Sequence, residues 1–211
     1  MHGKQGGYTA EMIKRIALLA PFAALVLALP LAAKEVPLDV LSAYLNGLSS
    51  FQSNFVQVNA DGSKSKGVLY VKRPGRARFE YAPPNKNLVI VAGGQVVIFD
   101  PKSKEPPEQY PLSRTPLNLI LAQNIDLAAA KGVVGHQEVG KATIVRWQDA
   151  KHPEYGTIDL VFSANPIALT KWIITDDIGN QTSVSLGALQ GGQSLSSNLF
   201  SMELELSKRG Q

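Results

Sequence analysis

Apolar and polar residues alternate along most of this chain, and the alternation is clearest in the segment RARFEY at residues 76–81. A period of two is that of a β-strand with one apolar face. Residues 67–73 form a second apolar run, separated from the first by Pro74-Gly75. Further runs bounded by turn residues are 51–59, 87–92, 95–100, 133–139, 142–148, 157–162, 169–175, 181–189 and 198–206. We therefore expect a mostly β protein of about 10 or 11 short antiparallel strands, a sandwich or a barrel.

Two segments depart from this period. Apolar residues spaced by three and four between Val40 and Leu48 predict an N-terminal helix with one apolar stripe. After a stretch interrupted by four prolines, the segment TPLNLIL at residues 115–121 predicts a short helix with Thr115 as N-cap and Pro116 as its first residue. Its aliphatic residues are too many for one stripe of so short a helix: Leu117, Leu119, Ile120 and Leu121. This helix must be covered on most sides or act as a plug.

The apolar strand residues allow two interpretations. They fill a closed core, as such residues usually do, or they line an apolar cleft whose mouth is occupied by the short helix. Periodicity alone does not separate the two, although a nearly all-apolar helix favours the cleft. The residues we assign to the cleft lining are Val71, Ala77, Phe79, Ile90, Ile98, Trp147, Leu160 and Trp172.

Arg73, at the end of the run 67–73, is the most informative polar residue. A solvated arginine at the end of a strand is one interpretation, because long basic side chains usually reach water. The other is that Arg73 donates to backbone carbonyls of the helix that begins at Thr115. Its five donors in a fixed fork suit that role, and one side chain would then latch a lid.

Residues 1–33 differ in kind from the rest. Lys14-Arg15 precedes the uncharged residues 16–33, which end in small residues before Lys34. This pattern predicts a cleavable secretory signal, cut near Ala33, and a single domain at residues 34–211. An uncleaved anchor is the alternative, since the uncharged run is about as long as the shortest membrane-spanning helices. Pro21 and the small residues before Lys34 favour cleavage.

Composition argues against several functions. Removal of residues 1–33 takes away three basic residues and one acidic residue from a chain with net charge +4, so the remaining balance shows no signal for binding nucleic acid. The chain has no cysteine, which excludes disulfides, thiol catalysis and cysteine-ligated zinc. No catalytic or phosphate-binding motif is present. We expect no enzyme, no metal and no cofactor.

The residues KRP at 72–74, the aromatic strand after them, the Gly93-Gly94 turn followed by FDP at 99–101, and the TPL segment together form a pattern. This pattern resembles the periplasmic outer-membrane lipoprotein carrier (LolA-like) family, from about Leu41 to Leu121 and more loosely beyond. The resemblance implies an unclosed, strongly bent antiparallel half-barrel with a helical lid, and Arg73 as the latch. Ala77 replaces a bulky aromatic common in relatives, and Phe79 replaces their usual tryptophan.

The resemblance also implies a function. Such a carrier is a monomer that shields the acyl chains of lipoproteins in the periplasm. It receives them from an ABC-type release complex of the inner membrane and passes them to an outer-membrane acceptor. Two alternatives stay open: a periplasmic module of the same fold that senses lipids or lipoproteins, and a lipid-modifying enzyme.

Overall fold

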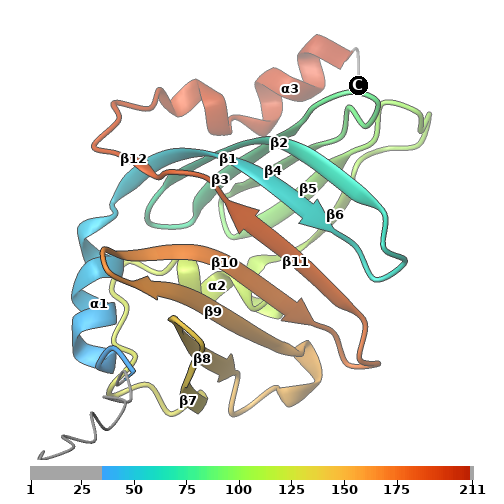
Figure 1. The fold of residues 1–211 in the computed structure, drawn as a ribbon. Helices are drawn as coiled ribbons and strands as arrows, with labels where there is room; N and C mark the ends of the chain where they lie inside the picture. Colours follow the sequence, from blue (N-terminus) through green and yellow to red (C-terminus); the bar gives the residue numbers. More distant parts are fainter. Residues whose placement is uncertain (1–34, 210–211) are drawn as a thin grey trace, which may run out of the picture. The chain divides into compact units, whose positions relative to one another are not determined.

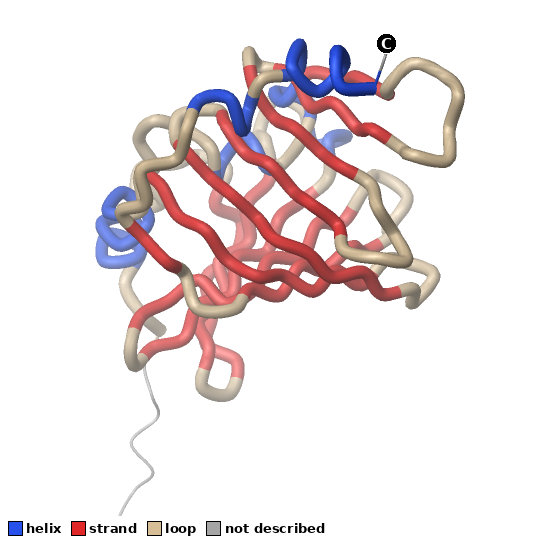
Figure 2. The backbone as a smooth tube through the Cα atoms, turned by 90° about the horizontal axis from the view of Figure 1, so that it is seen from above, coloured by secondary structure: helices blue, strands red, loops and turns tan. Residues whose placement is uncertain are grey.

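The computed structural model describes residues 35–209; the predicted signal at residues 1–33 lies outside this range. Within it, 12 strands form one antiparallel sheet in the order β6-β5-β4-β3-β2-β1-β11-β10-β9-β8-β7, with β12 paired to β1. The strands are β1 (Ser50–Val58), β2 (Lys64–Lys72), β3 (Arg76–Tyr81), β4 (Leu88–Ala92), β5 (Gln95–Phe99), β6 (Glu108–Pro111), β7 (Val133–Val139), β8 (Ala142–Gln148), β9 (Thr157–Ala164), β10 (Ile167–Thr175), β11 (Gln181–Leu186) and β12 (Gln190–Gly191). The sheet is bent (Figure 2) and does not close, because the end strands β6 and β7 each pair on one side and not with each other. The predicted fold class is confirmed.

The two strands that the sequence analysis did not predict, β6 and β12, are short. β12 has two residues, and β6 includes Pro111, which pairs with Gln95 at the edge of the sheet. A proline is tolerated there because an edge strand has one side without a ladder.

The helices lie on opposite faces of the sheet (Figure 1). They are α1 (Leu38–Gly47), α2 (Leu117–Ile120) and α3 (Met202–Arg209), with short 3-10 turns η1 (Leu112–Arg114), η2 (Pro153–Tyr155) and η3 (Ser197–Phe200). We call the face that packs against α1 and α2 the inner face and the face covered by α3 the outer face. The large hydrophobic cluster, which includes Leu41, Phe55 and Phe162, fills the inner side.

The strand predicted at residues 198–206 is wrong, because the chain forms η3 and α3 there. The segment MELELS has a period of two in its sequence, which led to the strand prediction. Met202 and Leu206 nevertheless pack together against the outer face, and a spacing of four puts them on one side of a helix. The hydroxyl of Ser201 also accepts a hydrogen bond from the Leu204 amide at 3.2 Å, which caps the helix start.

Candidate functional site

The bend of the sheet brings aromatic side chains from distant strands together on the inner face. Phe79 of β3 contacts Phe55 of β1, with ring centroids 5.6 Å apart. It also contacts Trp172 of β10 edge-on, with centroids 6.4 Å apart at 89°. Strands β2, β1 and β11 separate β3 from β10 in the sheet, so the Phe79–Trp172 contact spans the bend. These edge-to-face pairs join the two halves of the sheet through their side chains.

Most residues assigned to the cleft lining lie on this inner face. Val71, Ala77, Phe79, Leu160 and Trp172 are buried members of the large cluster, and Trp147 is partly buried against it. Ile98 is partly buried and pairs with Val89, which also packs against that cluster.

The assignment of Ile90 to the cleft lining is wrong. It is fully buried, but in a second cluster with Leu88, Val97 and Phe99 that α3 covers on the outer face. Strand β4 has the sequence LVIVA, apolar on both faces. A continuous apolar run carries no alternation by which the sequence assigns its residues to a face.

The segment between β6 and β7 carries the lid, which we define as residues 113–122. Its aliphatic side chains face the inner side of the sheet: Ile120 and Leu121 are 5% and 3% exposed, and Leu117 and Leu119 pack against the large cluster. The lid therefore covers the part of the inner face where a cleft would lie.

The start of the lid helix differs from the prediction. α2 begins at Leu117, and Pro116 is its N-cap. The hydroxyl of Thr115 donates to the carbonyl of Leu112 at 2.9 Å, so it closes the preceding turn η1 and does not cap α2.

Arg73 lies in the turn between β2 and β3, and its guanidinium donates to three backbone carbonyls. Nε reaches the Leu48 carbonyl at 3.0 Å and Nη1 the Ala122 carbonyl at 3.3 Å, while Nη2 donates to the Leu45 carbonyl. Burial lowers the pKa of Arg73 from its ordinary value. Two of the three acceptors belong to the C-terminal end of α1, where a positive charge is favourable, so Arg73 joins α1 to the end of the lid.

The same turn holds the lid through a second bond. Gly75 has a φ of +65°, a conformation that glycine adopts without strain. Its amide donates to the Leu121 carbonyl at 2.8 Å. We call these two contacts, Arg73 to Ala122 and Gly75 to Leu121, the latch. The sequence pointed to Arg73 but not to Gly75, whose role depends on the turn geometry.

Helix α1 contributes contacts that the sequence analysis missed. The side-chain amide of Asn46 donates to the Ile125 carbonyl at 2.8 Å, and its oxygen accepts from the Ile125 amide at 3.0 Å. The hydroxyl of Ser42 accepts from the Leu127 amide at 2.9 Å. Serine and asparagine at these positions give no sequence signal, because their partners lie about 80 residues away.

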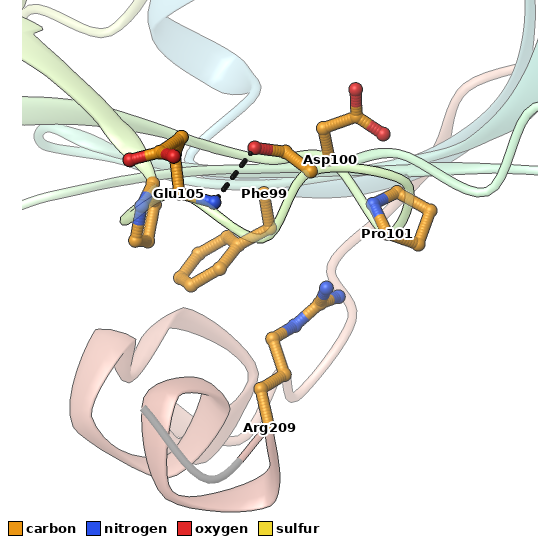
Figure 3. Close-up of a pocket in the computed structure, with 7 residues that line it drawn as sticks. Phe99, Asp100, Pro101, Glu105 and Arg209 are labelled. Atoms are coloured by element: carbon orange, nitrogen blue, oxygen red, sulfur yellow. Dashed lines mark hydrogen bonds between the residues drawn. The ribbon is translucent and has the colours of Figure 1, made fainter.

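The outer face has a pocket of its own, of about 250 Å³, between the β5–β6 loop and α3. Figure 3 shows Arg209 reaching from α3 toward the loop that carries Asp100 and Pro101. The Arg209 guanidinium carbon lies 4.9 Å from the centroid of the Phe99 ring. None of the residues assigned to the cleft lines this pocket.

Residues 35–209 contain no group of three or more histidine or acidic residues able to hold a metal ion. In the same range, no helix is both long enough and apolar enough to cross a membrane.

Residues 46–203 match the family model described as outer membrane lipoprotein carrier protein LolA. An outer-membrane lipoprotein carrier protein of Hahella chejuensis is 25% identical over 182 residues, which covers 82% of this chain and 86% of that protein. A protein of the same name from Legionella pneumophila (strain Paris) is 26% identical over 170 residues, 77% of this chain and 83% of the relative.

The crystal structure of a LolA superfamily protein from Nitrosomonas europaea aligns with a TM-score of 0.46 and 10% identity, over 80% of this chain and 99% of that chain.

Proposed function

Because this chain belongs to the family of outer-membrane lipoprotein carrier proteins, we propose that it binds the acyl chains of lipoproteins on its inner face and carries them from the inner to the outer membrane. The observation that carries the proposal is the lid: its four aliphatic side chains pack against the apolar inner face, and the latch consists of two hydrogen bonds to lid carbonyls. An apolar surface is suited to bind a lipid in place of the segment that covers it when only two hydrogen bonds hold that segment to the neighbouring turn.

The energies allow such an exchange. Exposing the four lid side chains, of which two are only partly buried, costs roughly 4 to 8 kcal/mol. Each methylene of an acyl chain gains about 0.8 kcal/mol on burial, so two or three long chains gain several times that cost. Binding is then favourable, and the cost of opening the lid weakens it enough to keep release possible without a nucleotide on the carrier.

Partners and location follow as parts of the same proposal. The cargo is an acylated lipoprotein, the donor an ABC-type release complex of the inner membrane, and the recipient an outer-membrane acceptor. The protein works in the periplasm as a monomer without catalysis, after a signal is cut near Ala33. Mass spectrometry of the exported product tests the cut: a product that retains residues 1–33 would contradict it.

A transfer assay tests the carrier role. The purified protein is loaded with a triacylated lipoprotein, separated from detergent and offered outer-membrane vesicles; the same lipoprotein without acyl chains is the control. We expect the acylated cargo to bind and then to appear in the vesicles. Binding without transfer would favour a sensor of lipoproteins. Covalent change of the lipid, read by mass spectrometry, would favour an enzyme.

A further inference from the structure

The hydrogen bonds on the N-terminal side of Gln123-Asn124 differ from those on the C-terminal side. Apart from the bonds of Thr115 to Leu112 in the turn η1, the hydrogen bonds that join the lid to other elements among residues 35–209 are the two of the latch, at Leu121 and Ala122. Residues 125–127, in contrast, are held by α1 through Asn46 and Ser42. Gln123 and Asn124 between them are exposed.

We propose that Asn46 is the anchor of the lid, a positioning residue that fixes Ile125 to α1 so that the lid opens as a flap about Gln123-Asn124. This inference rests on the proposed carrier function, because it concerns how the same inner face is uncovered. Asn46 suits the role because its side-chain amide pairs with both the amide and the carbonyl of one residue, as a neighbouring strand would.

Burial supports this difference between the two sides. Ile125 and Leu127 are 2% and 0% exposed and belong to the large cluster, so the anchored segment is held by side chains as well as by hydrogen bonds. Leu127 is also tied through Ser42, whose hydroxyl donates to the Leu38 carbonyl at 2.6 Å while it accepts from the Leu127 amide. Segments with few external hydrogen bonds open at low cost, whereas segments tied at several points open with the rest of the fold.

Arg73 connects the lid to the same helix that holds Ile125. Its guanidinium contacts α1 at Leu45 and Leu48 and the lid at Ala122. Release of Ala122 therefore leaves Arg73 attached to α1, and α1 remains attached to Ile125 through Asn46. Helix α1 therefore holds both Arg73 of the latch and Ile125 at the anchor. Because both stay in place when the lid opens, the lid can close again in the same position.

Hydrogen exchange of the empty protein, resolved by residue, tests the anchor without cargo. In Asn46→Ala we expect the Leu127 amide to exchange about tenfold faster than in the wild type, although its acceptor Ser42 is unchanged, because the segment loses two hydrogen bonds. In Arg73→Leu we expect the Leu121 and Ala122 amides to accelerate by a similar factor and Leu127 to stay protected. Asn198→Ala is the matched control, since Asn198 is exposed and its side chain makes no hydrogen bond within residues 35–209.

Two results would overturn the anchor: an unchanged Leu127 amide in Asn46→Ala, or equal acceleration of Leu127 and Leu121 in Arg73→Leu. Spin labels add a measurement in the loaded state, and the absence of cysteine from the chain makes their placement unambiguous. With one label at Ala43 on α1, loading with a triacylated lipoprotein should change the distance to a label at Asn118 and leave that to a label at Asp126 unchanged. A protein that fails in transfer but keeps the exchange pattern would refute the carrier function and leave the anchor standing.

Discussion

Arg73 and Ala122 lie 49 positions apart in the chain, and Nη1 of the first donates to the carbonyl of the second at 3.3 Å. The same guanidinium donates to the Leu45 and Leu48 carbonyls of α1. Arginine has enough donors to serve all three acceptors at once, and lysine has a single ammonium that does not reach three separate carbonyls in a fixed fork.

We expect Arg73→Leu to lower the free energy of unfolding by roughly 3 kcal/mol, since hydrogen bonds from a charged donor to three partly buried carbonyls are lost. Cargo release should slow, because a lid that no longer closes leaves the acyl chains without a competitor for the inner face. Chemical denaturation measures the first effect, and transfer from loaded protein to outer-membrane vesicles measures the second.

Arg76→Leu is the control for this prediction. Arg76 begins β3 on the other side of the same turn, and its guanidinium makes no hydrogen bond or ion pair with any other residue of the described chain. The control should keep wild-type stability and transfer. Equal behaviour of the two variants in both measurements would remove the latch from the model of function.

The extent to which the sequence predicts this architecture depends on how regular the local pattern is. Strands β2 and β3 and the existence of the lid helix were predicted from local signals, the alternation in the strands and the apolar segment after Thr115-Pro116, although Thr115 does not cap that helix. Ile90 was placed on the wrong face because its strand is apolar throughout, and α3 was predicted as a strand because its residues alternate. Asn46 was missed altogether, since its role depends on Ile125 lying beside it in space.

We predict that the contacts of the lid change when cargo binds, and residue-specific cross-linking measures this change. A photoreactive diazirine side chain at Leu117 should cross-link to inner-face strands in the empty protein, because Leu117 packs against the large cluster there. In the loaded protein the same group should react with cargo instead. The control position is Leu204 on α3, which is 42% exposed and should show no dependence on cargo. Identical products with and without cargo would mean that the lid stays closed.

Tyr81 predicts a loss of stability at alkaline pH. Its hydroxyl donates to the side-chain oxygen of Gln57 at 2.7 Å, and burial, with a smaller contribution from Tyr110, raises its pKa from 10.0 to about 12. Below pH 10 the phenol is neutral in both the folded and the unfolded state. Between pH 10 and 12 only the unfolded state loses the proton, so the free energy of unfolding should fall by roughly 2 kcal/mol.

Denaturation of wild type and Tyr81→Phe at a series of pH values checks this. The variant lacks the titrating group, so the part of the alkaline decrease that belongs to Tyr81 should vanish, while other groups still contribute. Parallel stability curves for the two proteins between pH 9 and 12 would rule out Tyr81 as a source of the decrease.

Arg78 should hold α3 against the outer face. It projects from β3 between Glu80, whose carboxylate it meets at 2.6 Å, and Glu205 of α3 at 3.5 Å, and it donates to the Leu199 carbonyl at 3.1 Å. The side chains of Arg78 and Glu205 are only 12% and 11% exposed. Replacing Arg78 by methionine leaves the Glu205 carboxylate largely buried, with Arg209 as its one remaining ion-pair partner among residues 35–209. Loss of one partner of a buried pair typically costs about 3 kcal/mol or more.

We therefore expect Arg78→Met to release α3, which hydrogen exchange would record as loss of protection in residues 202–209 while the lid stays protected. Arg146→Met is the matched control: it also takes an arginine away from a largely buried carboxylate, that of Asp159, which lies 2.6 Å away and is 12% exposed. This pair joins β8 to β9, so its loss should lower stability without releasing α3. If α3 stays protected in Arg78→Met, the apolar contacts of Met202 and Leu206 with the outer cluster are sufficient to hold the helix. If the lid opens together with α3, the two faces of β3 are coupled, and the outer helix then contributes to the closed state of the inner face.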